Sequence, residues 1–393
     1  TTLFRSRDNN AFCDCSGFTG TLTIGTSVAS IGQSAFKNCN GFYQVNYNAI
    51  NCANVISDDK PFENCSGTLT IGNTVQRIPS YMFNDADGLV GSLTIPNSVT
   101  VVGHCAFQAC DGFTGSLTIG NSVTTIEAGS FGWCPNFSGT LTIGSSVTTI
   151  EEFAFYEDSN FTGSLTIPNS VTTIGDYAFS GCGFTGSLTL GNSLTSIGYM
   201  AFHSCNEFTG SLTIPDSVTT IEDWAFYNCN GFTGTLTISN SVTTIGNMTF
   251  CSCSGFTGSL TIPNAVTSIG SQAFSNCGGF TNLNIGTSVT TIENSAFNYC
   301  TGLTSIMLYP ETPPTLGIDF TNVPRNIPVR VPCGKVSVYQ NASGRNEFTN
   351  IQEFCDPLTY SINPDGVSVT VTGHMDGTDA TGELFIPELK VID

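Results

Sequence analysis

The chain of 393 residues carries little charge, since Asp, Glu, Lys and Arg together make up 10% of it, where about a quarter is usual. Cations are the scarcest: ten Lys and Arg stand against 30 Asp and Glu, for a net charge of −20. Between Arg77 and Arg325 there is no basic side chain except histidine. A surface without cations cannot neutralise phosphates, which excludes nucleic acid as a partner.

Long apolar runs and histidines are also scarce. No run approaches the roughly 20 apolar residues that a membrane-spanning helix needs, so we expect no transmembrane segment in this chain. Only His104, His203 and His374 could act as histidine bases, and neither G-x-S-x-G nor H-E-x-x-H occurs. A polysaccharide hydrolase would need a carboxylate pair that the sequence does not reveal. We therefore expect no enzyme and no cofactor.

What the chain does contain is one motif, "LTI", repeated every 23 or 24 residues. It is anchored at Leu22, Leu69, Leu93, Leu117, Leu141, Leu165, Leu188, Leu212, Leu236 and Leu260, with weaker versions at Val45, Leu283, Ile306 and Val329. One such unit is too small to bury its own apolar face, so units of this length stack into a solenoid. About 14 coils at the roughly 4.8 Å spacing of strands give a body on the order of 65 Å long.

Each unit divides into three segments. Residues 165–167 alternate with period two, which predicts a short strand with Thr166 facing solvent. Residues 168–170, Pro-Asn-Ser, indicate a turn, and residues 171–174 predict a second extended segment. Residues 178–182, "AFSGC", have the spacing of a single helical or 3₁₀ turn that points its Phe inward.

The pattern at residues 212–229, L-T-I-P-x-S-V-T-x-I-x-x-x-A-F-x-x-C, resembles the BspA-like leucine-rich repeat family, also called the Treponema pallidum type. The resemblance covers roughly residues 11–333. It implies a β-rich, right-handed and curved solenoid with a parallel sheet on its concave face, short second strands and single helical turns. It also implies an extracellular or cell-surface location and a role in adhesion.

The resemblance also suggests a division of the chain. Residues 1–333 form the solenoid, and residues 334–356 resemble the segment that caps such arrays. Residues 357–393 alternate like strands, and "GELFIP" at 382–387 imitates "GSLTIP", as the start of a second array would.

Most of the 17 cysteines follow the Phe of the "AF" slot by three residues and so form a ladder, one rung per coil. These ladder positions are Cys15, Cys39, Cys65, Cys110, Cys134, Cys182, Cys205, Cys229, Cys253, Cys277 and Cys300. Side chains stacked in register point the same way, whereas a disulfide needs converging Cβ atoms, so we expect buried free thiols. The slot also holds Asp158 and Ala86, which suits packing and not a set of metal ligands.

The cysteines outside the ladder are better disulfide candidates. They are Cys13, Cys52, Cys105, Cys251, Cys333 and Cys355. A bond between Cys333 and Cys355 would brace the capping segment.

Two columns of hydroxyls are expected on the face of the "LTI" strands. The first, which we call the threonine column, is Thr94, Thr118, Thr142, Thr166, Thr189, Thr213, Thr237 and Thr261. The second, the serine column, is Ser92, Ser116, Thr140, Ser164, Ser187, Ser211, Thr235 and Ser259. Thr is favoured in strands, so the columns are consistent with a stiff spacer; they are equally consistent with a contact surface.

Aromatic residues that differ from coil to coil form a second candidate contact set, because recognition hot spots favour Trp and Tyr. They are Trp133, Tyr156, Tyr177, Tyr199, Trp224 and Tyr227.

The sequence thus predicts a non-enzymatic adhesion protein that binds a host or cell-surface protein, a glycan, or further copies of itself. The alternative is a self-assembling fibre or a rigid surface stalk.

Trypsin tests the unusual distribution of cations. Residues 78–324 contain no Lys or Arg, so trypsin should leave this stretch as one fragment even after the protein is denatured in urea. Mass spectrometry of the digest measures the fragment. Cleavage inside that window would contradict the prediction.

Overall fold

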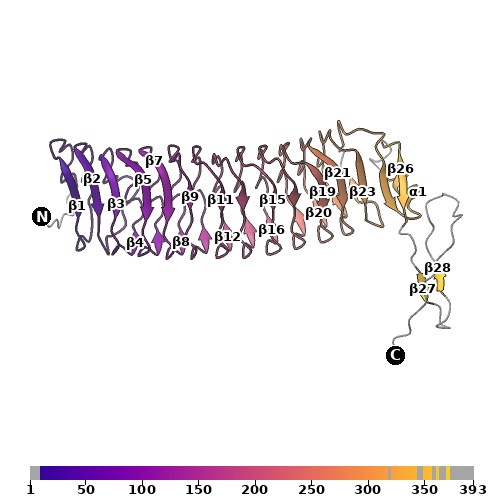
Figure 1. Ribbon diagram of the computed structural model, residues 1–393, viewed down its shortest axis with the longest axis horizontal. Helices are drawn as coiled ribbons and strands as arrows, with labels where there is room; N and C mark the ends of the chain where they lie inside the picture. The colour runs from indigo at the N-terminus through magenta and orange to yellow at the C-terminus, as the bar shows by residue number, and fades with distance from the viewer. Residues whose placement is uncertain (1–8, 317–319, 343–347, 356–359, 363–368, 372–393) are drawn as a thin grey trace, which may run out of the picture.

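The computed structural model describes residues 9–316, 320–342, 348–355, 360–362 and 369–371. About 14 coils stack into an elongated β-solenoid, as the sequence predicts, and the solenoid contains almost no helix (Figure 1). The resemblance implies a curved body, but Figure 1 shows little curvature in the plane of the view. In the described part of the chain, no helix has the length and apolar character to cross a membrane.

One strand per coil carries the "LTI" motif, and we call the surface of these strands the LTI face. They are β1 (Gly20–Ile24), β2 (Phe42–Tyr47), β3 (Gly67–Ile71), β5 (Leu89–Ile95), β7 (Phe113–Ile119), β9 (Leu141–Thr142), β11 (Leu165–Thr166), β13 (Leu188–Thr189), β15 (Leu212–Thr213), β17 (Leu236–Thr237), β19 (Gly258–Ile262), β21 (Phe280–Ile285), β23 (Ser305–Leu308) and β25 (Val329–Pro332). All their pairings are parallel, and the register places Leu22 beside Val45 and Ile306 beside Val329. The weaker motifs predicted from sequence are therefore confirmed as members of the same sheet face.

A second set of short parallel strands lies on another side of the coils. They are β4 (Arg77–Ile78), β6 (Val101–Val102), β8 (Thr125–Ile126), β10 (Thr149–Ile150), β12 (Thr173–Ile174), β14 (Ser196–Ile197), β16 (Thr220–Ile221), β18 (Thr244–Ile245), β20 (Ser268–Ile269), β22 (Thr291–Ile292) and β24 (Thr315–Leu316). Seven of them, β4 to β16, form one continuous sheet.

The core is built around a row of stacked rings, one from the "AF" slot of each coil, which we call the phenylalanine ladder. Its members are Phe12, Phe36, Phe62, Phe83, Phe107, Phe131, Phe155, Phe179, Phe202, Phe226, Phe250, Phe274, Phe297 and Phe320. Neighbouring ring centroids lie 5.1 Å apart at Phe83–Phe107 and 5.7 Å apart at Phe297–Phe320. A second stack continues from Phe113 to Phe280 in the segment before each LTI strand.

The close approach of successive coils explains one glycine in the motif. A Cβ atom at Gly191 would lie 2.3 Å from the backbone oxygen of Pro168 in the preceding coil. Contacts that short do not occur between non-bonded atoms, so a side chain at position 191 would require this backbone to shift, whereas other coils hold Pro215 or Ser239 at the same repeat position.

The "AF" segment is not a helical turn, which corrects the prediction from spacing. Backbone N–H groups of Ala178 and Cys182 do donate to carbonyls three residues earlier, at 3.3 and 3.2 Å. However, Tyr177 and Gly181 have left-handed backbones, with φ of 56° and 75°, which a right-handed helix does not tolerate. The N–H groups of Tyr177, Phe179 and Gly181 instead donate to carbonyls of the next coil at 2.8 Å.

The ladder cysteines are free thiols, all buried except the half-buried Cys15. From Cys110 to Cys300 each thiol donates to the carbonyl oxygen of a Phe in the preceding coil, as Cys134 does to Phe107 at 2.9 Å. Burial raises the pKa of Cys205 to about 12, which keeps that thiol protonated and able to donate. The ladder is therefore a line of hydrogen bonds between coils.

Asp158 interrupts this line. Its side chain is fully buried, and its Oδ1 accepts a hydrogen bond from the backbone N–H of Cys134 at 2.7 Å. The other oxygen, Oδ2, has no partner in the described part of the chain. Burial raises the pKa of Asp158 well above its ordinary value, since the charged form loses its hydration.

Replacing Asp158 by Cys should restore the ladder and stabilise the protein. At about pH 7 we expect a gain on the order of 1–3 kcal/mol in the free energy of unfolding, the usual penalty of an unpaired buried polar group. Because the folded pKa is raised, the wild-type carboxyl contributes its full stability below about pH 4 and loses it as the pH rises. Urea unfolding at several pH values should show the advantage of Asp158→Cys growing with pH. An advantage that is independent of pH would contradict this account.

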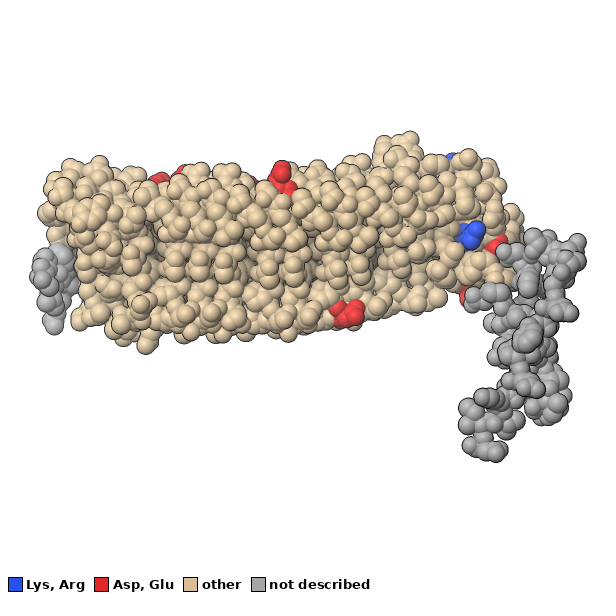
Figure 2. Space-filling model, in the orientation of Figure 1, with Lys and Arg blue, Asp and Glu red and all other residues tan. Residues whose placement is uncertain are grey.

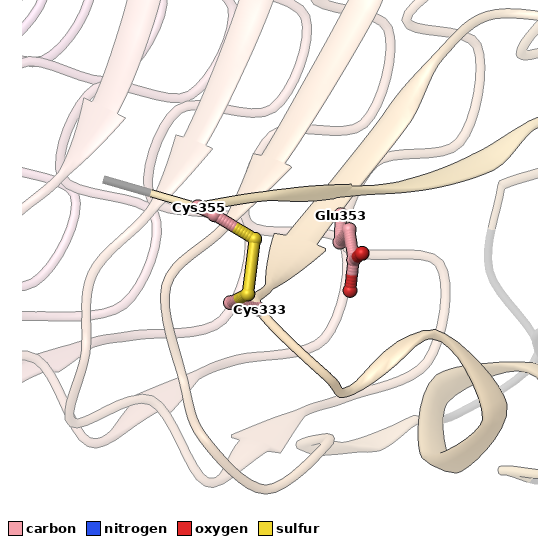
Figure 3. A group of neighbouring side chains, drawn as sticks. All are labelled: Cys333, Glu353 and Cys355. Carbon is pink, nitrogen blue, oxygen red and sulfur yellow. A yellow bond between two sulfur atoms is a disulfide. The ribbon is translucent and has the colours of Figure 1, made fainter. Parts of the chain in front are cut away.

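The last coil is covered by α1 (Val336–Gln340) and by β26 (Ile351–Phe354), which pairs in parallel with β25. Tyr339 of α1 is fully buried, and its hydroxyl donates to the carbonyl of Pro310 at 2.6 Å. A disulfide joins Cys333 to Cys355, one of the candidate pairs among the cysteines outside the ladder (Figure 3). The other cysteines outside the ladder, Cys13, Cys52, Cys105 and Cys251, are free thiols.

Beyond β26 the structure describes an antiparallel pair, β27 (Tyr360–Ile362) and β28 (Val369–Val371). The "GELFIP" sequence at 382–387 lies outside the described residues.

Removing the disulfide should loosen the C-terminal segment without unfolding the solenoid. The bond closes a loop with a sequence separation of 22, for which about 3 kcal/mol is typical. In a Cys333→Ser/Cys355→Ser variant we expect faster hydrogen exchange in α1 and β26 and unchanged exchange in β5 to β21. Equal protection of α1 and β26 in both proteins would show that packing alone holds the segment.

Candidate functional site

The threonine column lies on the LTI face with its side chains toward solvent. All its members are exposed except Thr118, which is half-buried. They alternate with buried Leu and Ile along the same strands, as at Leu165, Thr166 and Ile167. The structure therefore places these residues in one continuous outward row.

Other hydroxyl rows of the solenoid are used to join coils. On the turn before the second strands, Thr148 Oγ1 donates to the carbonyl of Thr124 at 3.1 Å, and Thr172 repeats the bond to Thr148 at 3.2 Å. In the serine column, Ser164 Oγ accepts the backbone N–H of Ser187 at 3.1 Å, and Ser211 Oγ accepts that of Thr235 at 3.0 Å. These hydroxyls are occupied by the structure.

The threonine column differs in this respect. From Thr94 to Thr237 its hydroxyls make no hydrogen bond to any other residue that the structure describes, whereas Thr261 accepts one from Asn284 Nδ2 at 3.1 Å. This part of the column presents free donors and acceptors to solvent at regular intervals. The sequence identified both columns but could not tell the occupied one from the free one.

A shallow groove of about 670 Å³ crosses the LTI face at β13, β15 and β17. Between β11 and β13, the backbone N–H groups of Leu165 and Ile167 donate to the carbonyls of Ser187 and Thr189 at 3.0 and 2.9 Å. Between β13 and β15 the pairing of LTI strands is interrupted, so these two strands belong to separate sheets. The groove lies over this break.

Both polar and apolar groups line the groove. The hydroxyl and amide groups belong to Ser187, Thr189, Asn192, Ser211, Thr213, Ser217, Thr237 and Asn240, and the apolar groups to Leu188, Leu190, Ile214, Pro215 and Ile238. The single lining carboxylate, Asp216, accepts the backbone N–H of Asn240 at 3.3 Å. The volume falls in the range of small-ligand sites, and the lining suits a ligand with polar and apolar parts. The face of the molecule seen in Figure 2 likewise carries few charged side chains.

Several carboxylates after the second strands accept backbone N–H groups of a neighbouring coil. Glu151 accepts the N–H of Ala128 at 2.9 Å, and Asp223 accepts that of Asn247 at 2.7 Å. Each such bond joins two coils, so these side chains hold the stack together.

The variable aromatics gather in two groups on the "AF" segments. In the first, Trp133 contacts Tyr156 with ring centroids 4.8 Å apart, and Tyr177 contacts Tyr199 at 5.4 Å. Phe153, which sequence reasoning missed, links them by stacking on Tyr177 at 4.8 Å. Phe153 occupies the same repeat position as Tyr177, and that alignment was the signal that could have found it.

The second group holds Trp224 and Tyr227, whose ring centroids lie 4.8 Å apart. His203 stacks on Tyr227 at 5.2 Å, and burial lowers the pKa of His203. His104 packs against Tyr81 at 5.2 Å, and His374 lies outside the described residues. The two described histidines are thus engaged with aromatic rings.

Among the described residues, the side chains that come together as metal ligands would are Cys333, Glu353 and Cys355, whose ligand atoms lie within 4.8 Å of one another (Figure 3). Both sulfurs belong to the disulfide, so neither is a thiolate that could bind a metal. Glu353 accepts the backbone N–H of Gly334 at 2.8 Å. The group is explained as a brace of the last coil.

A family model for the BspA type leucine-rich repeat region matches residues 5–136, 76–209 and 230–317, which is most of the chain. The chain belongs to the BspA-type leucine-rich repeat family. A search of curated proteins found no match to this BspA-type chain.

Comparison with solved structures supports the fold. A leucine-rich repeat protein from Bacteroides ovatus is 22% identical, with 88% of this chain and 86% of that chain covered and a TM-score of 0.63. A leucine rich cell surface protein from Faecalibacterium prausnitzii is 26% identical over 76% and 82% of the two chains, with a TM-score of 0.41. The pneumococcal vaccine antigen PcpA is 14% identical over 86% and 89%, with a TM-score of 0.47. Only the first of these likenesses is strong enough to support the fold.

Proposed function

We propose that this BspA-type protein is a non-enzymatic adhesion module, secreted or displayed at a cell surface, that binds an extended uncharged partner through the threonine column. The observation that carries the proposal is the contrast between hydroxyl rows. Hydroxyls on the neighbouring turns and most of those in the serine column bond between coils, whereas Thr94 to Thr237 present free hydroxyls. An extended ligand could meet several of these hydroxyls at once.

The groove over β13 to β17 is the part of the column best suited to begin such contact. It offers Thr189, Thr213 and Thr237 together with amide side chains in one depression. A neutral glycan chain or an extended polypeptide of a host or cell-surface protein matches this lining of hydroxyl, amide and apolar groups. The same proposal includes the extracellular or cell-surface location and the adhesive role. It also includes the division of the chain into residues 1–333, 334–356 and 357–393. Membership of the family supports this proposal.

The rival function, self-assembly into a fibre or stalk, meets an obstacle at one end of the solenoid. Tyr339 and the disulfide between Cys333 and Cys355 close the last coil, so a second copy cannot stack there without displacing them. Light scattering over a range of concentrations separates the two functions: discrete monomers favour adhesion, and regular filaments favour assembly.

The decisive variant removes three hydroxyls and leaves the shape of the face. In Thr189→Val/Thr213→Val/Thr237→Val we expect binding to fall at least about tenfold, because each lost hydrogen bond contributes roughly 0.5–1.5 kcal/mol. Binding is measured by surface plasmon resonance against neutral glycans and extracellular matrix proteins.

The matched control is Thr173→Val/Thr220→Val/Thr244→Val, which makes the same change on the second strands. Thermal unfolding should be similar in both variants. If the two variants bind equally, the threonine column is not the contact surface. If no partner in either class binds the wild type, the adhesive function itself fails.

A further inference from the structure

A contiguous group of rings lies on the "AF" segments, away from the LTI strands, and we call it the aromatic row. It consists of Trp133, Phe153, Tyr156, Tyr177 and Tyr199. The Trp133 residue is 41% exposed, and the other members are partly exposed. The row therefore forms a surface over several adjacent coils and not a part of the interior.

Three of these residues have a backbone conformation that bulky side chains disfavour. The φ angle is 59° at Trp133, 56° at Phe153 and 56° at Tyr177, all in the left-handed region. Glycine and asparagine adopt that region most easily. Equivalent positions of other coils hold Gly129, Gly181, Asn228 and Asn276, but also large side chains such as Met200, Trp224 and Met248. The left-handed backbone therefore does not select for aromatic rings, and their concentration in adjacent coils calls for another benefit.

Core packing does not supply that benefit. Beneath the row, Phe131, Phe155 and Phe179 of the phenylalanine ladder are fully buried and stack on one another at 5.5 and 5.1 Å. The core of these coils is complete without the row. Partly exposed Trp and Tyr side chains held on a rigid scaffold are typical of recognition hot spots.

The charge around the row indicates the kind of partner. Glu152, Glu157 and Asp176 lie in the same coils and are exposed. No Lys or Arg occurs between Arg77 and Arg325 to neutralise them. Rings beside unneutralised carboxylates complement Lys and Arg side chains, whose apolar stems and charged heads contact both.

We infer that the aromatic row is a docking surface for a basic, Lys- and Arg-bearing segment of a partner protein. The alkyl parts of those side chains lie against Trp133, Phe153 and Tyr177, and their charged groups pair with Glu152 and Glu157. This surface is separate from the threonine column and does not depend on it.

The test uses residues that suit the left-handed backbone. A Trp133→Asn/Phe153→Asn/Tyr177→Asn variant keeps the net charge, so a general attraction between an acidic protein and a cation is unchanged. The probe is a fluorescein-labelled peptide of alternating Lys and Arg, measured by fluorescence anisotropy near physiological ionic strength, where long-range attraction is screened. We expect at least about tenfold weaker binding, the loss of one hot spot, with a Tm that is unchanged or higher.

Two controls separate recognition from structure and from charge. Met248→Asn/Gln272→Asn makes the same change at left-handed positions outside the row, with φ of 51° and 56°, and should leave binding unchanged. Glu152→Gln/Glu157→Gln should weaken binding and reduce its dependence on salt.

Two outcomes would overturn the inference. A marked fall in the Tm of the triple Asn variant would show that the rings hold the fold. Equal peptide affinity for the triple Asn variant and the wild type would show that charge alone attracts the peptide. Because the threonine column is untouched in these variants, neither outcome bears on the adhesive function proposed for that column.

Discussion

Stacking of one coil on the next is the interaction on which everything else in this protein depends. A single coil has too few residues to bury an apolar core, and it acquires one only when its Phe ring lies against the rings of its neighbours. The unbroken phenylalanine ladder from Phe12 to Phe320 shows how far this continues. Hydrogen bonds between backbones, from thiols to carbonyls and from backbone N–H groups to carboxylates then keep each coil in register with the next.

Register turns a repeated sequence into a patterned surface. Because equivalent residues lie side by side, each outward position of the motif becomes a column with a uniform chemical character. Most hydroxyls of the serine column and of the Thr124–Thr172 row make bonds between coils, whereas those of the threonine column from Thr94 to Thr237 do not. The repetition thus supplies both the stability of the body and the regular spacing of its exposed hydroxyls.

Departures from the pattern are as informative as the pattern. Asp158 replaces a ladder thiol with a buried carboxyl that has one unpaired oxygen. Trp133, Phe153 and Tyr177 place large rings on a left-handed backbone, which glycine and asparagine adopt most easily. All four residues lie within a few coils of one another. Stability and recognition are commonly opposed in this way at functional surfaces.

Much of the architecture follows from the sequence alone. The spacing of Leu22, Val45 and Leu69 specified the strand register, and the slot three residues after each Phe identified the thiol ladder, because a period of 23 or 24 residues allows only neighbour stacking. The sequence did not reveal that the "AF" segment is left-handed at two positions, since that conformation is imposed by hydrogen bonds to the next coil. For the same reason, only the tertiary structure separated free hydroxyls from engaged ones and joined Phe153 to Tyr177. Which atoms of adjacent coils come into contact depends on the distances between coils. The spacing of residues along the sequence does not give those distances.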